Sequence, residues 1–383
     1  MSIMKRTRLN ILALAGGIIA MPLTAVAQTS VTLYGVVDAG VGYERVKGPN
    51  GFSQSRVGSV DGVNSGSRWG LRGQEDLGDG LRAIFNVESG FSANTGMSGQ
   101  SNRLFGRRAT VGLASDDWGT LEFGRRINLA SDWIGNIVDP FGTSFRTANL
   151  GSAFSAANTM RVDNLVLYQT PTFGGWQAGL GYSFNVDSTR ADNAPGTTDF
   201  ATGNNNRLLT AGLRYSNGPV YAALSYDRLN PTNGAVGGQS PARIQQYMIA
   251  GSYDFEILKV HAIFGQTYDG WFQGQTMGVT PNEGGFENMG TYKLRDGFRA
   301  NSYLLGATLP LGASKVFASW QRADPNNTSL TGDDSTMNVY SVGYTYDLSK
   351  RTNLYAYVSY GDNYAFNRDA SNQAAAVGLR HRF

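Results

Sequence analysis

The stretch SRWGLRGQEDLGDGLRAIFNVE (residues 67–88) alternates polar and apolar side chains on both sides of the turn sequence DLGDG. Arg68, Arg72 and Arg82 fall on one face, while Trp69 and Phe85 belong to the other. A period of two residues predicts β-strands, because successive side chains of a strand point to opposite faces. We therefore predict a β-hairpin with one charged and one apolar face. Which face meets water depends on the rest of the chain.

The same pattern recurs along the chain. We count sixteen strand-like runs between residues 31 and 383, most of about ten residues, the length of a tilted membrane-crossing strand. Short turns alternate with long loops, which lie near 47–66, 91–102, 128–163, 186–206, 230–242, 269–297, 323–335 and 362–372. A soluble β-sandwich has no reason to sort its loops in this way, and no segment supplies helices that could cover the apolar faces. The sequence predicts an all-β fold, a 16-stranded antiparallel transmembrane β-barrel with lipid outside, water inside and both termini on the short-turn side.

The N-terminus has the three parts of a secretory signal peptide. Basic residues within the first eight positions precede the apolar stretch ILALAGGIIAMPL, and Ala25-Val26-Ala27 forms a small-residue cleavage site. We expect residues 1–27 to be removed, which leaves 28–383 as the transmembrane β-barrel. The chain would then reach the bacterial outer membrane and cross it many times.

Composition excludes several other functions. Loss of the three basic residues in the signal peptide, out of 32 in the chain, leaves 29 to balance the 29 acidic residues, so the mature chain offers no basic surplus for nucleic acid. There is no cysteine, and no later stretch is long and apolar enough for a membrane-spanning helix. The spacing of Asp79, Asp333 and Asp334 is not that of a calcium loop, and no phosphate-binding glycine loop occurs. We expect no cofactor and no metal.

Several motifs together are typical of one family. The chain resembles the general-diffusion porins of Gram-negative outer membranes in SVTLYGVVDAG (30–40), the hairpin at 67–91, LFGRRATVGLASDDWGTLEFGRR (104–126) and the end VGLRHRF (377–383). The resemblance implies a homotrimer in outer-membrane lipid, with a water-filled pore in each subunit for passive diffusion of ions and small hydrophilic solutes. It also implies that Phe383 is an assembly signal for the barrel-assembly machinery. The small outward residues Gly35, Ala39 and Ala375 suit close packing between subunits.

The longest loop, 128–163, is the expected constriction loop. In the family the third long loop folds into the barrel. Here that loop carries Trp133, Ile134 and Phe141, which would gain nothing from exposure to solvent. An inward-folded third extracellular loop is therefore expected on both grounds.

Charged residues near this loop are the candidates for the pore constriction. Alternation places Arg68 toward the lumen. The family pattern selects Arg125, whereas strict alternation selects Arg126 unless the strand bulges, so both are kept. The remaining candidates are the loop acids Asp132 and Asp139 with the basic residues Arg146 and Arg161. For the arginines the alternative is a solvated strand residue or a salt bridge at the rim, and for the two acids it is a turn cap. The basic excess favours a mild anion preference.

Three other functions are weighed against an open channel. The small number of large apolar residues facing the lumen argues against a structural or adhesion barrel with a plugged lumen. A barrel enzyme of the protease or lipase class needs a histidine with a partner near the outer rim. The chain has only His261 and His381, both near short turns or the C-terminus, so we predict no enzyme activity. A substrate-specific porin would differ only by an aromatic track along its lumen, and the sequence leaves that alternative open.

Overall fold

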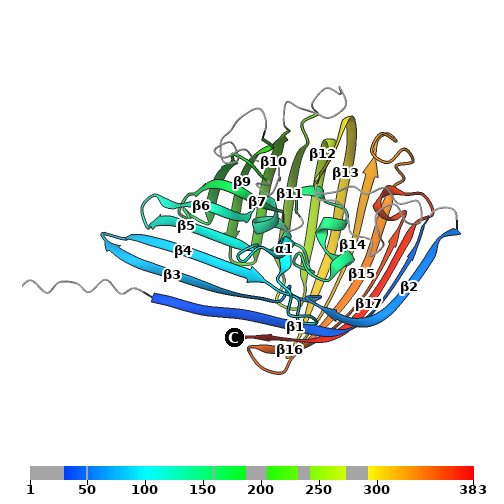
Figure 1. Cartoon of the computed structure of the whole chain (residues 1–383), viewed down its shortest axis with the longest axis horizontal. Helices are drawn as coiled ribbons and strands as arrows, with labels where there is room; N and C mark the ends of the chain where they lie inside the picture. Colours follow the sequence, from blue (N-terminus) through cyan, green and yellow to red (C-terminus); the bar gives the residue numbers. More distant parts are fainter. Residues whose placement is uncertain (1–29, 49–50, 158–159, 187–204, 232–241, 273–291) are drawn as a thin grey trace, which may run out of the picture.

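The computed structural model describes residues 30–48, 51–157, 160–186, 205–231, 242–272 and 292–383 (Figure 1). The predicted signal peptide lies outside the described residues. The strands are β1(Ser30–Lys47), β2(Ser53–Asp61), β3(Arg68–Gly78), β4(Leu81–Gly90), β5(Arg108–Ser115), β6(Gly119–Ile127), β7(Arg161–Gln169), β8(Trp176–Ser183), β9(Arg207–Asn217), β10(Val220–Asn230), β11(Gln245–Asp254), β12(Lys259–Phe272), β13(Tyr292–Leu311), β14(Ser314–Pro325), β15(Met337–Asp347), β16(Thr352–Asp362) and β17(Ser371–Arg382). Short helical turns are α1(Gly99–Asn102), η2(Ala130–Gly135), η3(Arg146–Ala148), η4(Leu150–Ser152), η5(Ser155–Ala157) and η7(Tyr364–Phe366).

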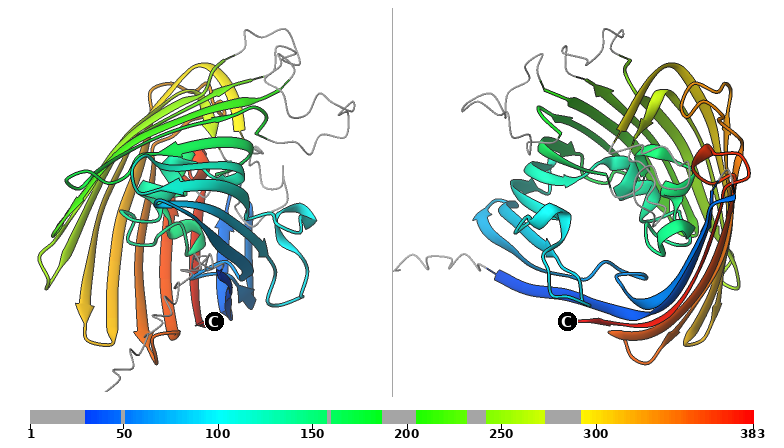
Figure 2. Two further views of the ribbon diagram at one scale, coloured as in Figure 1. Left: turned by 90° about the vertical axis from the view of Figure 1, so that its left-hand side faces the viewer. Right: turned by 45° about the vertical axis from the view of Figure 1, so that its right-hand side comes forward.

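These strands form one closed antiparallel barrel. Apart from β2 and β3, each strand pairs with the next along the chain. β1 pairs with β17 from Val36↔Arg382 to Lys47↔Ser371, which closes the sheet (Figure 2). Strands β2 and β3 both pair with β1, one beyond the other, and so occupy a single position in the ring. The barrel therefore has sixteen strand positions, as predicted, and each predicted run contains an observed strand.

The first predicted loop is wrong in one respect. Residues 53–61, assigned from sequence to a long loop at 47–66, form β2. Only the segment Gly62–Ser67 leaves the strand ladder, and we call it the excursion between β2 and β3. The buried carboxylate of Asp38 stabilises it by accepting hydrogen bonds from the amides of Val63 and Ser65, at 3.3 and 2.8 Å. A strand that is interrupted and then resumes looks like a loop in sequence, because β2 is rich in Ser and Gly rather than in alternating apolar residues.

Burial along the strands fixes which face is which. On β10 and β11, Ser225, Asp227 and Gln246 are buried, whereas the alternate residues Leu224 and Ile249 are exposed. The outer surface of the barrel is thus the apolar one, which is the arrangement predicted for the hairpin at 67–88. Among the described residues, no helix is long and apolar enough to span a membrane.

Segment 128–157 packs against the inward-facing side chains of the barrel. Its short helices lie within the ring of strands (Figure 2). Ser302 of β13 donates to the Ala153 carbonyl at 2.5 Å, and Gln321 of β14 donates to the Ala148 carbonyl at 2.7 Å. Polar side chains buried on the inner wall therefore find their partners in the backbone of this segment.

Candidate functional site

Arg68 lies in an ion-paired group on the inner wall. Its Nε is 3.4 Å from a carboxylate oxygen of Glu88 on the neighbouring strand β4, and Arg107 donates to the other oxygen at 2.6 Å. Tyr34 of β1 also donates to Glu88, at 3.0 Å. Alternation along β1, β3 and β4 brings these side chains to one face. Glu88 is therefore shared between two guanidinium groups.

A β-bulge lies beside Arg125 and Arg126. The register between β6 and β7 shifts between Gly124 and Arg126, so that β7 contributes one extra residue. Gly124 has a φ of +125°, and a Cβ there would lie 2.0 Å from the Ala109 carbonyl oxygen, so the bulge requires glycine. Arg125 pairs with Asp163, and Arg126 pairs with Glu122 and Asp132. Both arginines left open by the sequence thus form ion pairs with buried acids, Asp163 and Glu122.

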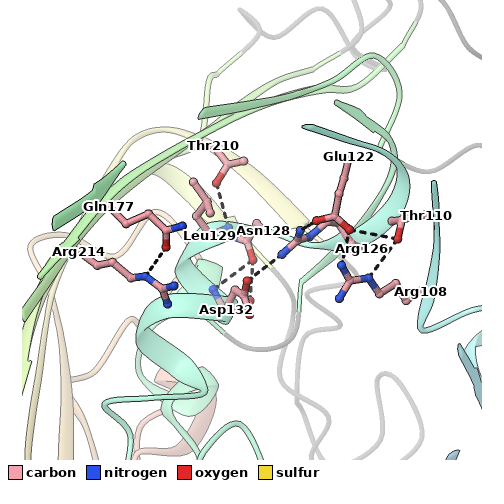
Figure 3. Close-up of polar contacts among 11 residues, drawn as sticks. Arg108, Thr110, Glu122, Arg126, Asn128, Leu129, Asp132, Gln177, Thr210 and Arg214 are labelled. Atoms are coloured by element: carbon pink, nitrogen blue, oxygen red, sulfur yellow. Dashed lines mark hydrogen bonds and ion pairs between the residues drawn. The ribbon is translucent and has the colours of Figure 1, made fainter. Parts of the chain in front are cut away.

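Figure 3 shows how Arg126 connects the wall to the loop. Glu122 binds Arg126 and also Arg108 of β5, while Arg126 reaches Asp132 of η2 at 2.8 Å. Nearby, Asn128 donates to Asp227 of β10 at 2.9 Å, and the Leu129 amide donates to Thr210 of β9 at 3.2 Å. The first turn of the loop is therefore fixed by polar contacts to β6 and to β9 and β10.

Arg161 and Arg103 complete the basic group. Arg161 begins β7 and lies close enough to Arg107 and Arg125 for their charges to interact, and its buried Nε has no hydrogen-bond partner in the described part of the chain. One guanidinium nitrogen of Arg103 donates to both carboxylate oxygens of Asp163, at 2.7 and 2.9 Å. We call the whole set the arginine wall; it comprises Arg68, Arg103, Arg107, Arg108, Arg125, Arg126 and Arg161.

In most of these pairs the guanidinium is the more exposed partner. The Arg108 side chain is 33% exposed and that of Glu122 only 6%. Arg103 and Asp163 differ in the same way, at 25% and 8%. The two pairs of Arg126 are the exceptions, because Arg126 is 5% exposed, Glu122 6% and Asp132 31%. The wall carboxylates therefore lie behind the arginines, and the surface presented to the interior is mainly cationic.

Asp139 does not belong to this surface. It is 4% exposed and accepts the amide hydrogens of Phe141 at 2.9 Å and Leu150 at 2.7 Å. Burial raises the pKa of Asp139 to about 7, although these amide hydrogen bonds oppose the rise. The prediction that this carboxylate lines the constriction does not fit this geometry. The alternative, a turn cap within the loop, does.

Trp133 anchors the loop on the wall formed by β8 and β9. Gly179 and Gly212 are direct cross-strand partners, and a Cβ on either would approach the indole to 2.9 Å. The Arg214 guanidinium lies 4.8 Å from the ring centroid, and Tyr221 donates to the Trp133 carbonyl at 2.7 Å. Two glycines in register thus make room for one buried indole.

The tip of the loop is held by an aromatic cluster, which we define as Phe141, Phe145, Phe317, Tyr355 and Tyr357. The Phe145 ring centroid lies 5.4–5.9 Å from the rings of Phe317, Tyr355 and Tyr357, all in edge-to-face contact. The Phe145 amide also donates to the Val63 carbonyl, at 2.6 Å, in the excursion between β2 and β3. The tip therefore packs on β14, β16 and the interrupted strand.

Arg146 follows this tip but stays apart from the arginine wall. It is exposed, and its guanidinium has no ion pair among the residues that the structure describes. It lines a cavity with Glu44, Arg56 and Tyr357, on strands near the β1–β17 pair. The structure thus separates Arg146 from the other predicted basic residues.

The C-terminal residue Phe383 pairs with β1. Its amide and carbonyl both pair with Gly35, at 3.1 and 3.0 Å. A Cβ on Gly35 would lie 2.2 Å from the Phe383 ring. Gly35 is therefore covered by the chain's own C-terminal ring, and its predicted availability to a neighbouring subunit is wrong.

Part of the arginine wall is not predicted by the sequence pattern. Arg103, Arg107 and Arg108 were not among the candidates, although Arg108 shares the inward parity of Thr110 on β5. Arg103 and Arg107 belong to a loop, where alternation gives no information. The clustering of five arginines between residues 103 and 126 with the acids that pair them was the available signal.

Neither histidine has the setting of a catalytic base. His261 contacts Thr308 at 3.1 Å, and His381 contacts Thr352 at 2.8 Å. No group of three or more potential metal ligands occurs among the described residues.

Comparisons with known proteins agree with this architecture. A family model described as Gram-negative porin matches residues 12–365. An outer membrane porin protein of Bordetella pertussis is 52% identical, over 99% of this chain and all of that protein, and outer membrane porin protein 32 of Delftia acidovorans is 31% identical, over 98% and 99%. The solved structure of an anion-selective porin from Comamonas acidovorans superposes with a TM-score of 0.69 at 28% identity, covering 93% of this chain and 100% of that one. The chain belongs to the Gram-negative porin family and is an outer-membrane diffusion channel, not an enzyme.

Proposed function

We propose that this porin is anion-preferring and that the arginine wall and loop 128–163 form its constriction. The observation that carries the proposal is the relative exposure of the paired charges. Glu122 and Asp163 lie behind guanidinium groups, so an ion in the interior would meet the cations first. Fixed charges act strongly in a narrow channel, where little water screens them.

The net charge of the wall also favours anions. The seven arginines of the wall face the four carboxylates of Glu88, Glu122, Asp132 and Asp163. The similar solved porin is described as anion-selective. The inward tyrosines Tyr355 and Tyr357 are buried beneath the loop, which argues against the open aromatic track of a substrate-specific porin.

The reversal potential under a KCl gradient tests this proposal. We expect a wild-type potential with the sign of anion preference. The double substitution Arg68→Gln/Arg107→Gln removes both guanidinium partners of Glu88 and should shift the potential toward cations. Arg299→Gln, an exposed position on the outward face of β13, is the matched control and should leave it unchanged. An unaltered potential in the double variant would remove these residues from the constriction.

We also propose that the mature chain, 28–383, assembles as a homotrimer through the outer face near the β1–β17 pair. An outward depression of about 450 Å³ lies there, with Ala356 and Ala375 between the exposed residues Val41, Val342 and Val358. Apolar packing over small residues suits contact between subunits. A monodisperse monomer in mild detergent with full channel activity would contradict the trimer.

Phe383 is proposed to serve assembly by the barrel-assembly machinery rather than conduction. Its ring and backbone complete the seam against Gly35, at the end of the barrel away from the long loops. Deletion of Phe383 should lower the folded yield in the outer membrane and leave unit conductance unchanged, whereas Phe383→Tyr, which keeps an aromatic ring, should restore yield. Normal yield after deletion would count against this role.

A further inference from the structure

A second group of arginines lies on the outside of the barrel. Arg207 of β9 and Arg228 of β10 alternate with the buried residues Leu208, Asp227 and Leu229, so their side chains point outward. Arg243 stands between the buried residues Ala242 and Ile244 just before β11 and is exposed. We call these three residues the outer arginine cluster.

Strand pairing brings the three side chains together. Arg228 is the direct partner of Leu209 on β9 and of Gln245 on β11. Arg207 and Arg243 each lie two residues further along those strands, on the same face. Such diagonal neighbours are about 7–8 Å apart at the backbone, within reach of long side chains. The cluster therefore spans three adjacent strands at the end of the barrel that carries the long loops.

These charges are not compensated. In the part of the chain that the structure describes, no carboxylate pairs with any of the three, and the Nε atoms of Arg207 and Arg228 are buried without a hydrogen-bond partner. The arginine wall is different, because nearly every guanidinium there has an acidic partner. Three unpaired cations in close proximity repel one another and favour binding of an anion.

The surroundings of the cluster suit an amphiphile. Tyr226 and Tyr268, on the same outward face, donate to Gln245 and Gln266 at 2.7 and 2.6 Å, which fixes their rings in place. Further along the same strands, away from the long loops, the outward residues are Leu213, Leu224 and Ile249, all exposed. Aromatic and basic residues above an apolar band are typical of the boundary between headgroups and acyl chains.

The position within the barrel also fits lipid. Strand β10 lies eight positions from β1 in either direction around the ring, so the cluster is on the side opposite the β1–β17 pair (Figure 1). That pair is where we place the contact between subunits. In a trimer so arranged, the outer arginine cluster would face the membrane.

We propose that Arg207, Arg228 and Arg243 bind the phosphorylated headgroup of a glycolipid in the outer leaflet, with its acyl chains against Leu224 and Ile249. Guanidinium groups bind phosphate through paired, charge-assisted hydrogen bonds. The inference depends on the outer-membrane location of the chain and not on the ion preference proposed above.

The test measures lipid binding to the full-length mature protein in detergent by native mass spectrometry. The probes are lipid A, its dephosphorylated form and inorganic phosphate. The variant is Arg207→Gln/Arg228→Gln/Arg243→Gln. The matched control is Lys350→Gln/Arg351→Gln/Arg368→Gln, which removes three exposed cations elsewhere. Because all six positions lie outside the arginine wall, unit conductance and reversal potential should stay at wild-type values and show that each variant is folded.

Lipid A should bind the wild type and the control equally, and the triple variant about 100-fold more weakly, since each basic residue near an anionic membrane surface contributes about fivefold. Dephosphorylated lipid A should bind the wild type as weakly as lipid A binds the variant. Equal binding of lipid A to variant and wild type would overturn the proposal, as would equal binding of the dephosphorylated lipid. Displacement of lipid A by inorganic phosphate at comparable concentration would show an anion site without lipid recognition and would also overturn it. If the triple variant loses conductance, its barrel is disturbed, and lipid A binding is then measured on the three single substitutions. Each of these should weaken binding about fivefold, and unchanged binding in all three would overturn the proposal.

Discussion

The two inner walls of the barrel face the same loop but hold it by different means. On β3 to β7 many inward residues are arginines paired with acids. They hold the loop through ion pairs, of Arg126 with Asp132 near its start and of Arg103 and Arg125 with Asp163 at its end. On β14 and β16 the inward residues Phe317, Tyr355 and Tyr357 enclose Phe141 and Phe145 of the loop tip. Alternation places both sets inside. Whether an inward residue meets water or protein depends on where the loop rests.

The difference has an energetic consequence. Edge-to-face aromatic packing in a dry cluster gains from both area and ring geometry, whereas a partly exposed ion pair contributes less because water screens it. The tip should therefore be the firm attachment and the arginine side the adjustable one. Three predictions test this contrast, beginning with the largest effect.

Phe145→Ala should release the loop tip. The substitution leaves a cavity among four aromatic rings and should cost about 3–5 kcal/mol of local stability. Hydrogen exchange of the Phe145 and Ala148 amides should accelerate, and single-channel current should become larger or noisier. Phe173→Ala, at an exposed short turn, is the control and should change neither. Unchanged protection of the tip would mean that the aromatic cluster does not hold it.

Asp139 should make the same attachment sensitive to pH. Burial raises the pKa of Asp139 to about 7, whereas an unfolded aspartate titrates near 3.9. Between these values the folded carboxyl binds more protons than the unfolded one, so stability falls as pH rises from about 4 to about 7 and is then constant. Asp139→Asn should lack this component.

The measurement is the exchange rate of the Phe141 and Leu150 amides, which bond to this carboxylate, at several pH values after correction for intrinsic exchange. The pH slope, not the absolute stability, is the informative quantity, because the asparagine amide cannot accept both bonds. Identical slopes in wild type and Asp139→Asn would contradict the assignment. Asp132→Asn serves as the control, since Asp132 is partly exposed and outside this hydrogen-bond set.

Asp132→Asn should have the smallest effect on stability and a measurable one on selectivity. Its ion pair with Arg126 is partly exposed, so the loss should be below about 1 kcal/mol. Arg126 keeps Glu122 as a partner. Asp132 is the most exposed carboxylate among the ion pairs of the wall, so its neutralisation should move the reversal potential toward anion preference. This shift is opposite in sign to the one expected for Arg68→Gln/Arg107→Gln. A shift toward cations would show that Asp132 does not face the ion path.

Sequence alone determined the strands and their faces. Because a strand has a period of two, the hairpin at 67–88 already specified which face of each strand would be charged. The alternation of short turns with long loops specified a barrel. The apolar composition around Trp133 and Phe141 likewise predicted a loop that avoids solvent. These are local properties, readable one segment at a time.

The tertiary structure decided what depends on contacts between distant segments. Beside a bulge where β7 carries one extra residue, both Arg125 and Arg126 form ion pairs with buried acids, although strict alternation would place only one of them inward. Asp38, 25 residues before Val63 in the chain, turned an expected loop into an interrupted strand. Asp139 became a buried cap because Leu150, 11 residues later, supplied its second amide. The pairing of a charge, and its exposure, are set by neighbours that no periodicity within a single segment can identify.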